Sequence, residues 1–269
     1  MMGMNHAISG AAAWVAVTGA APLLATGAYP LDPVGVVAGA TVCAGAALLP
    51  DADHHSATIS RSVPILGPLA ARTIGALSGG HRHGAHSPVA VLIVAAAAWA
   101  LTALTVPVEP IGRFDPGTVA IGAGIGTAAL TAFAVKARDL VESWLTAWLV
   151  GVALGFFIVV VAPEQIAWFP LAVTLGFIAH LVGDALTTGG LPGLLWPWVP
   201  RPPEIVGDIP LLNRLWLPNG YLALPLLGDT GSWREKAFGA LLTLYCTLGL
   251  GYEVLRLVGA EQLLSRLNM

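Results

Sequence analysis

Aspartates and histidines of this chain gather in three short motifs whose side chains could bind a metal ion. The first is DADHH, residues 51–55, which directly follows an apolar run, and the second is HRHGAHS, residues 81–87. The third is His180-x-x-x-Asp184, inside an apolar segment. Residues four apart on a helix project from the same face, so His180 and Asp184 could share one cation. The alternative for this pair is a buried hydrogen bond that steadies helix packing.

The acidic pair Asp51 and Asp53 stands where a long apolar segment ends. Negative side chains are unfavourable at the C-terminal end of a helix, because the helix dipole places partial negative charge there. A bound cation would remove this penalty. A solvated helix end with local turn hydrogen bonds is the alternative.

The candidate metal ligands offer nitrogen and oxygen atoms, a donor set that favours zinc, manganese or iron over magnesium or calcium. They are His6, Asp51, Asp53, His54, His86, His180 and Asp184. This set is large enough for two divalent ions, and two-metal sites typically activate water for attack on phosphate esters.

Three residues are predicted to act on the substrate: Asp53, His81 and Arg82. The planar guanidinium of Arg82 could orient a phosphate, and His81 could pass a proton to the leaving group. His55 and His83 are expected to face solvent.

The composition is that of a membrane protein. Hydrophobic residues make up 56% of the chain and charged residues 10%, with a mean hydropathy of +0.78, whereas a soluble domain carries about 25% charged residues. Apolar runs of about 20 residues can cross a bilayer as helices. We therefore predict an all-α, polytopic helical bundle that forms one membrane-embedded domain, residues 1–269. The expected spans are residues 7–27, 33–49, 88–106, 118–135, 140–162, 167–188 and 237–258. Cys43 and Cys246 fall in two of them and are expected to be core residues.

Two long connections, residues 50–87 and 189–236, are predicted to lie at the membrane interface. The first contains ILGPLAARTIGAL, which could form a short interfacial amphipathic helix. The second holds four of the nine tryptophans and eight prolines. Proline prevents a regular helix and tryptophan favours the headgroup region, so this segment is either an interfacial belt or a lid over a site.

Basic residues predict the orientation of the chain. The side with the N-terminus and both long connections carries nine Lys and Arg residues, and the other side carries three, Arg113, Arg256 and Arg266. The positive-inside rule places the nine-residue side, the N-terminus and the site in the cytoplasm. All seven histidines, together with Asp51, Asp53 and Asp184, belong to this side. That agreement favours one site.

The motifs LLPDADHHS, HRHGAHSP and AHLVGDALTTGGLPGLLWPW resemble the signature blocks of the YdjM-like family of inner-membrane metal-dependent hydrolases. Ala85 and Ala179 stand where Thr and Ser are common in that family, and GDTGSWREKAF resembles its closing block, which makes Glu235 a further candidate. The resemblance implies a metal-dependent hydrolase of the cytoplasmic membrane, but not its substrate.

The favoured function is hydrolysis of a phospholipid or lipid-linked phosphoester at the cytoplasmic membrane surface, with zinc the expected metal. Membrane lipids are the expected partners, and no basic patch suggests nucleic acid. The alternatives are a metal or proton-coupled transporter, which would place its charged residues near the bilayer midplane, and a membrane scaffold whose metal only holds the helices together.

Overall fold

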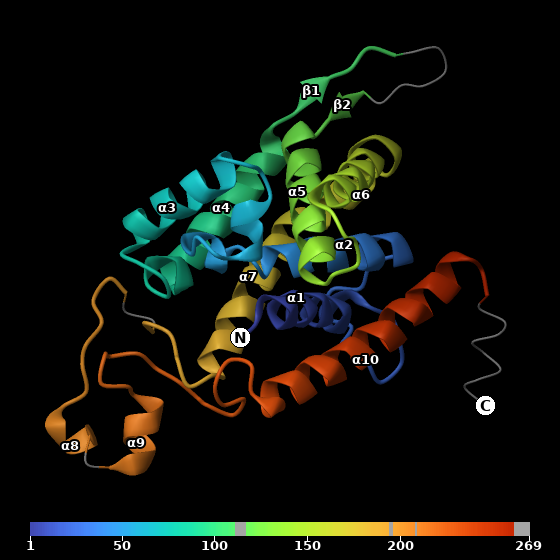
Figure 1. Ribbon diagram of the computed structural model, residues 1–269. Coiled ribbons are helices and arrows are strands. Elements are labelled where there is room, and N and C mark those ends of the chain that lie inside the picture. The colour runs from blue at the N-terminus through green and yellow to red at the C-terminus, as the bar shows by residue number, and fades with distance from the viewer. Residues whose placement is uncertain (111–116, 194–195, 208, 261–269) are drawn as a thin grey trace.

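A helix lies at the position of each expected span in the computed structural model, which describes residues 1–110, 117–193, 196–207 and 209–260 (Figure 1). These helices are α1 (Gly3–Thr18), α2 (Pro33–Ala46), α4 (Pro88–Ala103), α5 (Ile121–Ala137), α6 (Trp144–Phe156), α7 (Phe169–Ala185) and α10 (Trp233–Leu257). Three irregular helical segments extend them: Pro50–Asp53 after α2, Phe157–Val161 after α6 and Pro163–Trp168 before α7. Of the residues that the structure describes, 65% are helical.

Four helical segments of the described residues are long and apolar enough to cross a membrane. They are Pro33–Asp53, Trp144–Val161, Pro163–Ala185 and Trp233–Leu257. The apolar helices α4 and α5 have 16 and 17 residues, and α1 has 16. At a rise of 1.5 Å per residue these three reach only about 25 Å, less than the hydrocarbon core of a typical bilayer. The prediction of about seven spans is therefore not confirmed.

Side-chain caps begin several of these helices where the sequence turns from polar to apolar. The Asp32 carboxylate accepts the N–H of Gly35 at 2.8 Å and is followed by Pro33. The Ser87 hydroxyl accepts the N–H of Ala90 at 3.3 Å and is followed by Pro88. A hydroxyl or carboxylate cap and a proline in the first turn both suit a helix start. The predicted start of the third span at Ser87-Pro88 is confirmed.

Small residues allow the helices to approach closely. A side-chain carbon at Gly151 of α6 would lie 2.1 Å from the Ala128 carbonyl oxygen of α5, so α5 and α6 pack backbone to backbone, as small-xxx-small spacing predicts. Helices α1, α2 and α7 form the centre of the bundle, with α4, α5 and α10 around them. Cys43 and Cys246 are buried free thiols.

The helix ends that carry the three motifs meet at one end of the bundle. The start of α1 lies beside the end of α7, near the N-terminus in Figure 1. Arg138, just after α5, donates to the Met4 carbonyl oxygen and to the Thr243 hydroxyl, both at 3.3 Å. The end of α5 therefore lies beside the start of α1 and the middle of α10. Arg113 and Arg266 lie outside the described residues.

The fold departs from all-α in one place. Strands β1 (Val106–Pro107) and β2 (Thr118–Val119) form an antiparallel ribbon between α4 and α5. It replaces the last residues of the expected span 88–106 and the first of 118–135, because α4 ends at Ala103 and α5 begins at Ile121.

Both long connections contain short helices. Helix α3 (Leu66–Ser78) forms as predicted and exposes Leu66, Leu69 and Leu77. In the described part of the other connection, α8 (Glu204–Gly207) and α9 (Pro210–Leu215) form and project from the bundle in Figure 1. Its Trp198 and the neighbouring Trp233 are 67% and 74% exposed. Exposed tryptophan is typical of an interfacial segment.

Candidate metal centre

Five residues from four parts of the chain converge where α1 begins and α2 and α7 end. His6 comes from α1, Asp51 from the turn after α2, His86 from the turn before α4, and His180 and Asp184 from α7. Three overlapping groups of side chains could each hold a metal ion: His6, Asp51 and His180; Asp51, His81 and His86; and His86, His180 and Asp184. Five of the seven sequence-predicted ligands are thus brought together, and Asp53 and His54 are not among them.

Three ligand atoms face one another, and a fourth lies close to two of them. His86 Nε2 lies 3.2 Å from His180 Nε2, and each of these nitrogens lies 3.6 Å from Asp184 Oδ2. Asp51 Oδ1 is 3.7 Å from His86 Nε2 and 3.8 Å from His180 Nε2. Ligands at the usual zinc–nitrogen distance of about 2.0–2.1 Å stand about 3.4 Å apart in a tetrahedron. The spacing of His86, His180 and Asp184 therefore suits three ligands of one cation.

The second nitrogen of each imidazole faces an oxygen. His180 Nδ1 lies 2.7 Å from the carbonyl oxygen of Ala47, which can only accept, so Nδ1 carries the proton and donates. His86 Nδ1 lies 3.3 Å from Asp53 Oδ2. An oxygen behind a ligating imidazole is the usual arrangement at metal sites, because it sets the tautomer and turns the other nitrogen toward the ion.

The centre contains buried polar atoms that have no hydrogen-bond partner in the protein. Asp184 Oδ2 and His6 Nδ1 are two of them, in side chains that are at most 1% exposed. Buried polar groups normally have a hydrogen-bond partner. A carboxylate oxygen without such a partner, next to two imidazole nitrogens, is a favourable position for a cation. The donor set and this orphaned oxygen fit a divalent transition metal.

The two carboxylate oxygens of Asp184 have different neighbours. Oδ2 faces His86 and His180, whereas Oδ1 lies 3.2 Å from His6 Nε2 and 3.1 Å from Arg82 Nη2. The N-terminal amine of Met1 also donates to Oδ1. The His6 ring stacks on His180 with centroids 3.6 Å apart. Asp184 could therefore serve two adjacent cations.

Asp53 lies behind the centre. Its Oδ1 is 2.8 Å from His81 Nδ1, and its Oδ2 faces His86 and accepts the backbone N–H of Arg82 at 3.2 Å. Asp53 is absent from the three described metal-binding groups. Its contacts are those of a residue that orients imidazoles.

A polar cavity of about 550 Å³ opens beside the centre. Its walls include Asp51, His54, His81, Arg82, Thr188 and Thr230. Arg82 adopts a positive φ of 59°, a left-handed conformation that is unusual outside glycine. Thr188 and Thr230 were not among the predicted site residues, although TTGG directly follows α7.

The charge of His86 depends on its carboxylate neighbours. Burial lowers the pKa of His86, but Asp51 and Asp53 beside the ring outweigh it and raise that pKa to about 9. In the absence of a metal, the proton on His86 supplies positive charge between these carboxylates.

Four further candidates lie outside the three groups of ligand atoms. His54 borders the polar cavity and its Nδ1 contacts the Ser56 hydroxyl at 2.8 Å. His55 is exposed, as predicted. His83 is exposed but bonds to Tyr221 of the connection 189–236, so it does more than face solvent. Glu235 is buried and accepts N–H groups from Met2, Asn5 and Gly231.

The fold and the site define a helical membrane protein with a buried cluster of histidine and aspartate able to hold a metal ion. Residues 1–258 match the family described as YdjM inner membrane protein, and the chain belongs to this family. The resemblance seen in the sequence motifs is thereby confirmed. No curated protein and no solved structure matches the chain.

Proposed function

We propose that the protein is a metal-dependent hydrolase that cleaves a phosphoester of a phospholipid or lipid-linked phosphate at the membrane surface. The observation that carries this proposal is the pair of imidazole nitrogens, His86 Nε2 and His180 Nε2, 3.2 Å apart. His180 Nδ1 donates to the Ala47 carbonyl, so Nε2 is the nitrogen turned toward His86. A proton or a cation must therefore lie between the two nitrogens, and the neighbouring carboxylates favour the cation.

Asp51, His86, His180 and Asp184 would hold one ion, and zinc suits their nitrogen and oxygen donors. His6, with the second oxygen of Asp184, would hold another, and His54 would support it from the cavity wall. Bound metal lowers the pKa of water and stabilises charge on phosphate oxygens. Asp53 would set the orientation of His81 and His86 as a supporting residue.

The polar cavity is the place for the phosphate. Arg82 Nη2 is held by Asp184 at 3.1 Å, which fixes the guanidinium at the cavity wall. An arginine fixed in this way keeps further N–H groups for phosphate oxygens. Thr188 and Thr230, on the same wall, add hydroxyls that can donate to the substrate.

His81 is placed to protonate the leaving group. Its side chain is 38% exposed at the cavity, and Nδ1 is held by Asp53 at 2.8 Å. Hydrolysis adds a water oxygen to phosphorus and breaks the ester P–O bond, so the departing alkoxide needs a proton. An imidazole held by a carboxylate is a suitable donor. His81 would regain its proton from the attacking water.

The setting of the centre supports a lipid substrate. The cluster lies at one end of apolar helices, and α3, which exposes Leu66, Leu69 and Leu77, packs against the turn that carries Asp51 and Asp53. A headgroup can reach the metals there while its chains stay in hydrocarbon. The count of basic residues in the connections supports a cytoplasmic position for this end.

The test measures metal content and hydrolysis with protein purified in detergent. We expect about stoichiometric zinc, and release of product from bis(p-nitrophenyl) phosphate and from phospholipids, with both lost in His180→Ala. Absence of a bound transition metal, or unchanged turnover in Asp53→Ala, would contradict the proposal. Metal flux into proteoliposomes without hydrolysis would favour a transporter, and metal that stabilises without hydrolysis would favour a scaffold.

A further inference from the structure

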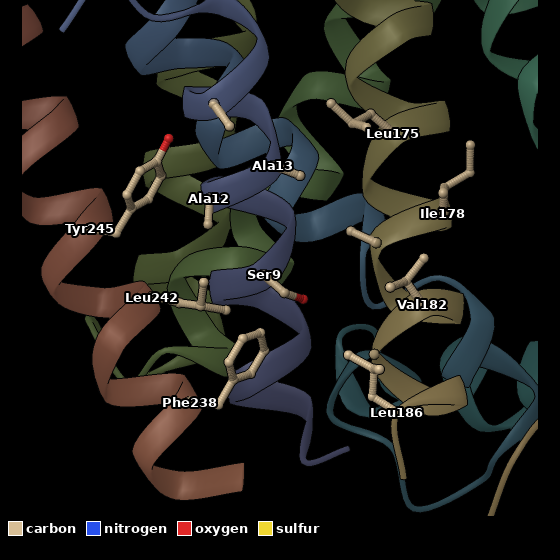
Figure 2. Close-up of a pocket in the computed structure, with 13 residues that line it drawn as sticks. Ser9, Ala12, Ala13, Leu175, Ile178, Val182, Leu186, Phe238, Leu242 and Tyr245 are labelled. Atoms are coloured by element: carbon tan, nitrogen blue, oxygen red, sulfur yellow. The ribbon is translucent and has the colours of Figure 1, made fainter. Parts of the chain in front are cut away.

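A groove of about 470 Å³ runs along the membrane face of α1, between α7 and α10 (Figure 2). Its floor is made of the small residues of α1, namely Ser9, Ala12, Ala13 and Ala16. Leu175, Ile178 and Val182 of α7 form one wall, and Phe238, Leu242 and Tyr245 of α10 form the other. The groove exists because alanine and serine on α1 lie between larger side chains on both neighbours.

The groove follows the helix axes and begins at the metal centre. Ser9, Phe238 and Leu186 mark its near end, and Ala16, Tyr245 and Leu175 its far end. Ala16 comes seven positions after Ser9, a rise of about 10 Å, and Leu186 comes eleven positions after Leu175, a rise of about 16 Å. In a bilayer whose normal is parallel to the bundle axis, lipid chains run along that axis. The long direction of the groove is therefore the direction of a lipid chain.

The near end adjoins the ligand residues directly. Ala179 and Gly183, which line the groove, are the sequence neighbours of His180 and Asp184. A side-chain carbon at Gly183 would lie 3.4 Å from His6 Nδ1, the buried nitrogen without a partner. The α7 backbone at Gly183 and the side chain of Met1 therefore lie between this part of the groove and the centre.

We propose that this groove holds one acyl chain of the lipid whose phosphate is bound at the metal centre. The inference rests on the proposed function and adds a substrate-binding subsite to it. Two helices that wall the groove, α7 and α10, belong to segments long and apolar enough to span the membrane, so lipid chains are the molecules available there. The anionic headgroup matches Arg82 and the bound cations, and the groove allows one chain to run from that headgroup into the hydrocarbon.

A second apolar cavity, of about 450 Å³, lies on the other side of the centre and serves as the comparison. It is lined by α3, α4 and Trp196, and Ala90 is one of its small residues. Trp196 also contacts Gly84, where a side-chain carbon would lie 2.6 Å from the indole ring. The loop segment thus covers this cavity, whereas the groove on α1 lies between helices alone.

The binding test uses the full-length protein in nanodiscs with a phosphatidylglycerol that carries a diazirine in one palmitoyl chain. Photolysis is expected to label peptides of α1, α7 and α10. Leucine in place of Ala13 fills the floor and should lower labelling about tenfold, the loss expected when roughly two methylene groups lose their burial. The matched control Ala90→Leu fills the other cavity and should label like the wild type.

The opposite pattern overturns the inference: unchanged labelling in Ala13→Leu, or labelling of α3 and α4 that Ala90→Leu abolishes. Zinc content and thermal unfolding show whether Ala13→Leu is folded. Ala16→Leu, at the far end, provides a second variant, which should exclude a palmitoyl chain and admit a hexanoyl chain.

The activity test separates this inference from the proposed function. Ala16→Leu should lower kcat/KM about tenfold for a dipalmitoyl substrate and leave the dihexanoyl substrate and bis(p-nitrophenyl) phosphate unchanged. Equal effects on all three substrates would contradict the acyl-chain groove. If no phosphoester is cleaved at all, the proposed function fails, and the labelling experiment still decides whether the groove binds a lipid chain.

Discussion

His86 Nε2 and His180 Nε2 face each other at 3.2 Å, across a gap bordered by the carboxylates of Asp51 and Asp184. The two histidines are 94 residues apart in the chain, and each is turned by an oxygen behind its ring. In the metal-free protein the proton of His86 supplies positive charge beside this gap. A metal cation in its place would bind both nitrogens and give the orphaned oxygen of Asp184 a partner.

Asp184→Asn is expected to abolish zinc binding, since an amide keeps the shape of the side chain but loses its charge and one acceptor oxygen. Zinc is measured by mass spectrometry after dialysis against a weak chelator. The control is His55→Ala, at an exposed position outside the three groups, which should keep the metal. Full zinc retention in Asp184→Asn would refute the assigned ligand set.

Asp53→Asn tests the difference between a ligand and a supporting residue. Loss of a carboxylate behind a ligating imidazole typically lowers metal affinity 10- to 100-fold. We expect an effect of about that size in Asp53→Asn, measured by competition with a chromogenic chelator. Asp51→Asn removes a proposed ligand and should cost more. Equal losses in the two variants would place Asp53 among the ligands.

Zinc affinity is expected to increase with pH up to about 9, the raised pKa of His86. The proton on His86 must leave before its nitrogen can bind the ion, so affinity should change about tenfold per pH unit below that value. In the metal-free protein the same proton stabilises the folded state below the ordinary pKa of 6.5, and this contribution is lost as pH increases to about 9. A flat affinity profile between pH 6.5 and 9 would argue against His86 as a ligand.

Arg82→Lys should lower turnover of a phosphoester while zinc stays bound. Lysine keeps the charge but not the planar fork that contacts Asp184 and a phosphate at once. Hydrogen bonds to charged groups contribute about 1.5–3 kcal/mol, which corresponds to a decrease in kcat/KM of about 10- to 100-fold. Steady-state kinetics and zinc content measured on the same preparation check this. Wild-type kinetics in Arg82→Lys would remove Arg82 from the substrate site.

Glu235→Ala is expected to destabilise the bundle where α1 and α10 begin. The carboxylate accepts N–H groups from Met2, Asn5 and Gly231 at 2.6–2.7 Å, and each donor left buried without an acceptor costs about 1–3 kcal/mol. Thermal unfolding in detergent should show a lower midpoint, and zinc affinity should fall because His6 follows Asn5 directly. Glu235→Gln, which keeps an acceptor oxygen, should recover part of both losses.

The sequence by itself indicated the helical membrane class, the helix start at Ser87-Pro88, and five residues that the structure brings together at the candidate metal centre. These follow from local properties: hydropathy over a span, a cap before a proline, and i, i+4 spacing for His180 and Asp184. Counting the spans predicted that the three motifs lie on the same side of the membrane. The convergence of their helix ends supports this prediction.

The tertiary structure decided which of these residues face the cation site and which orient the ligands. Asp51 and Asp53 look alike in DADHH, yet Asp51 faces the gap between the histidines, whereas Asp53 turns behind His81 and His86. The Ala47 carbonyl that orients His180 and the groove on α1 also depend on packing. The physical reason is that a carboxylate's role depends on the groups its oxygens face, and long-range contacts bring those groups together. Likewise, a row of small residues becomes a groove only when larger neighbours stand on both sides.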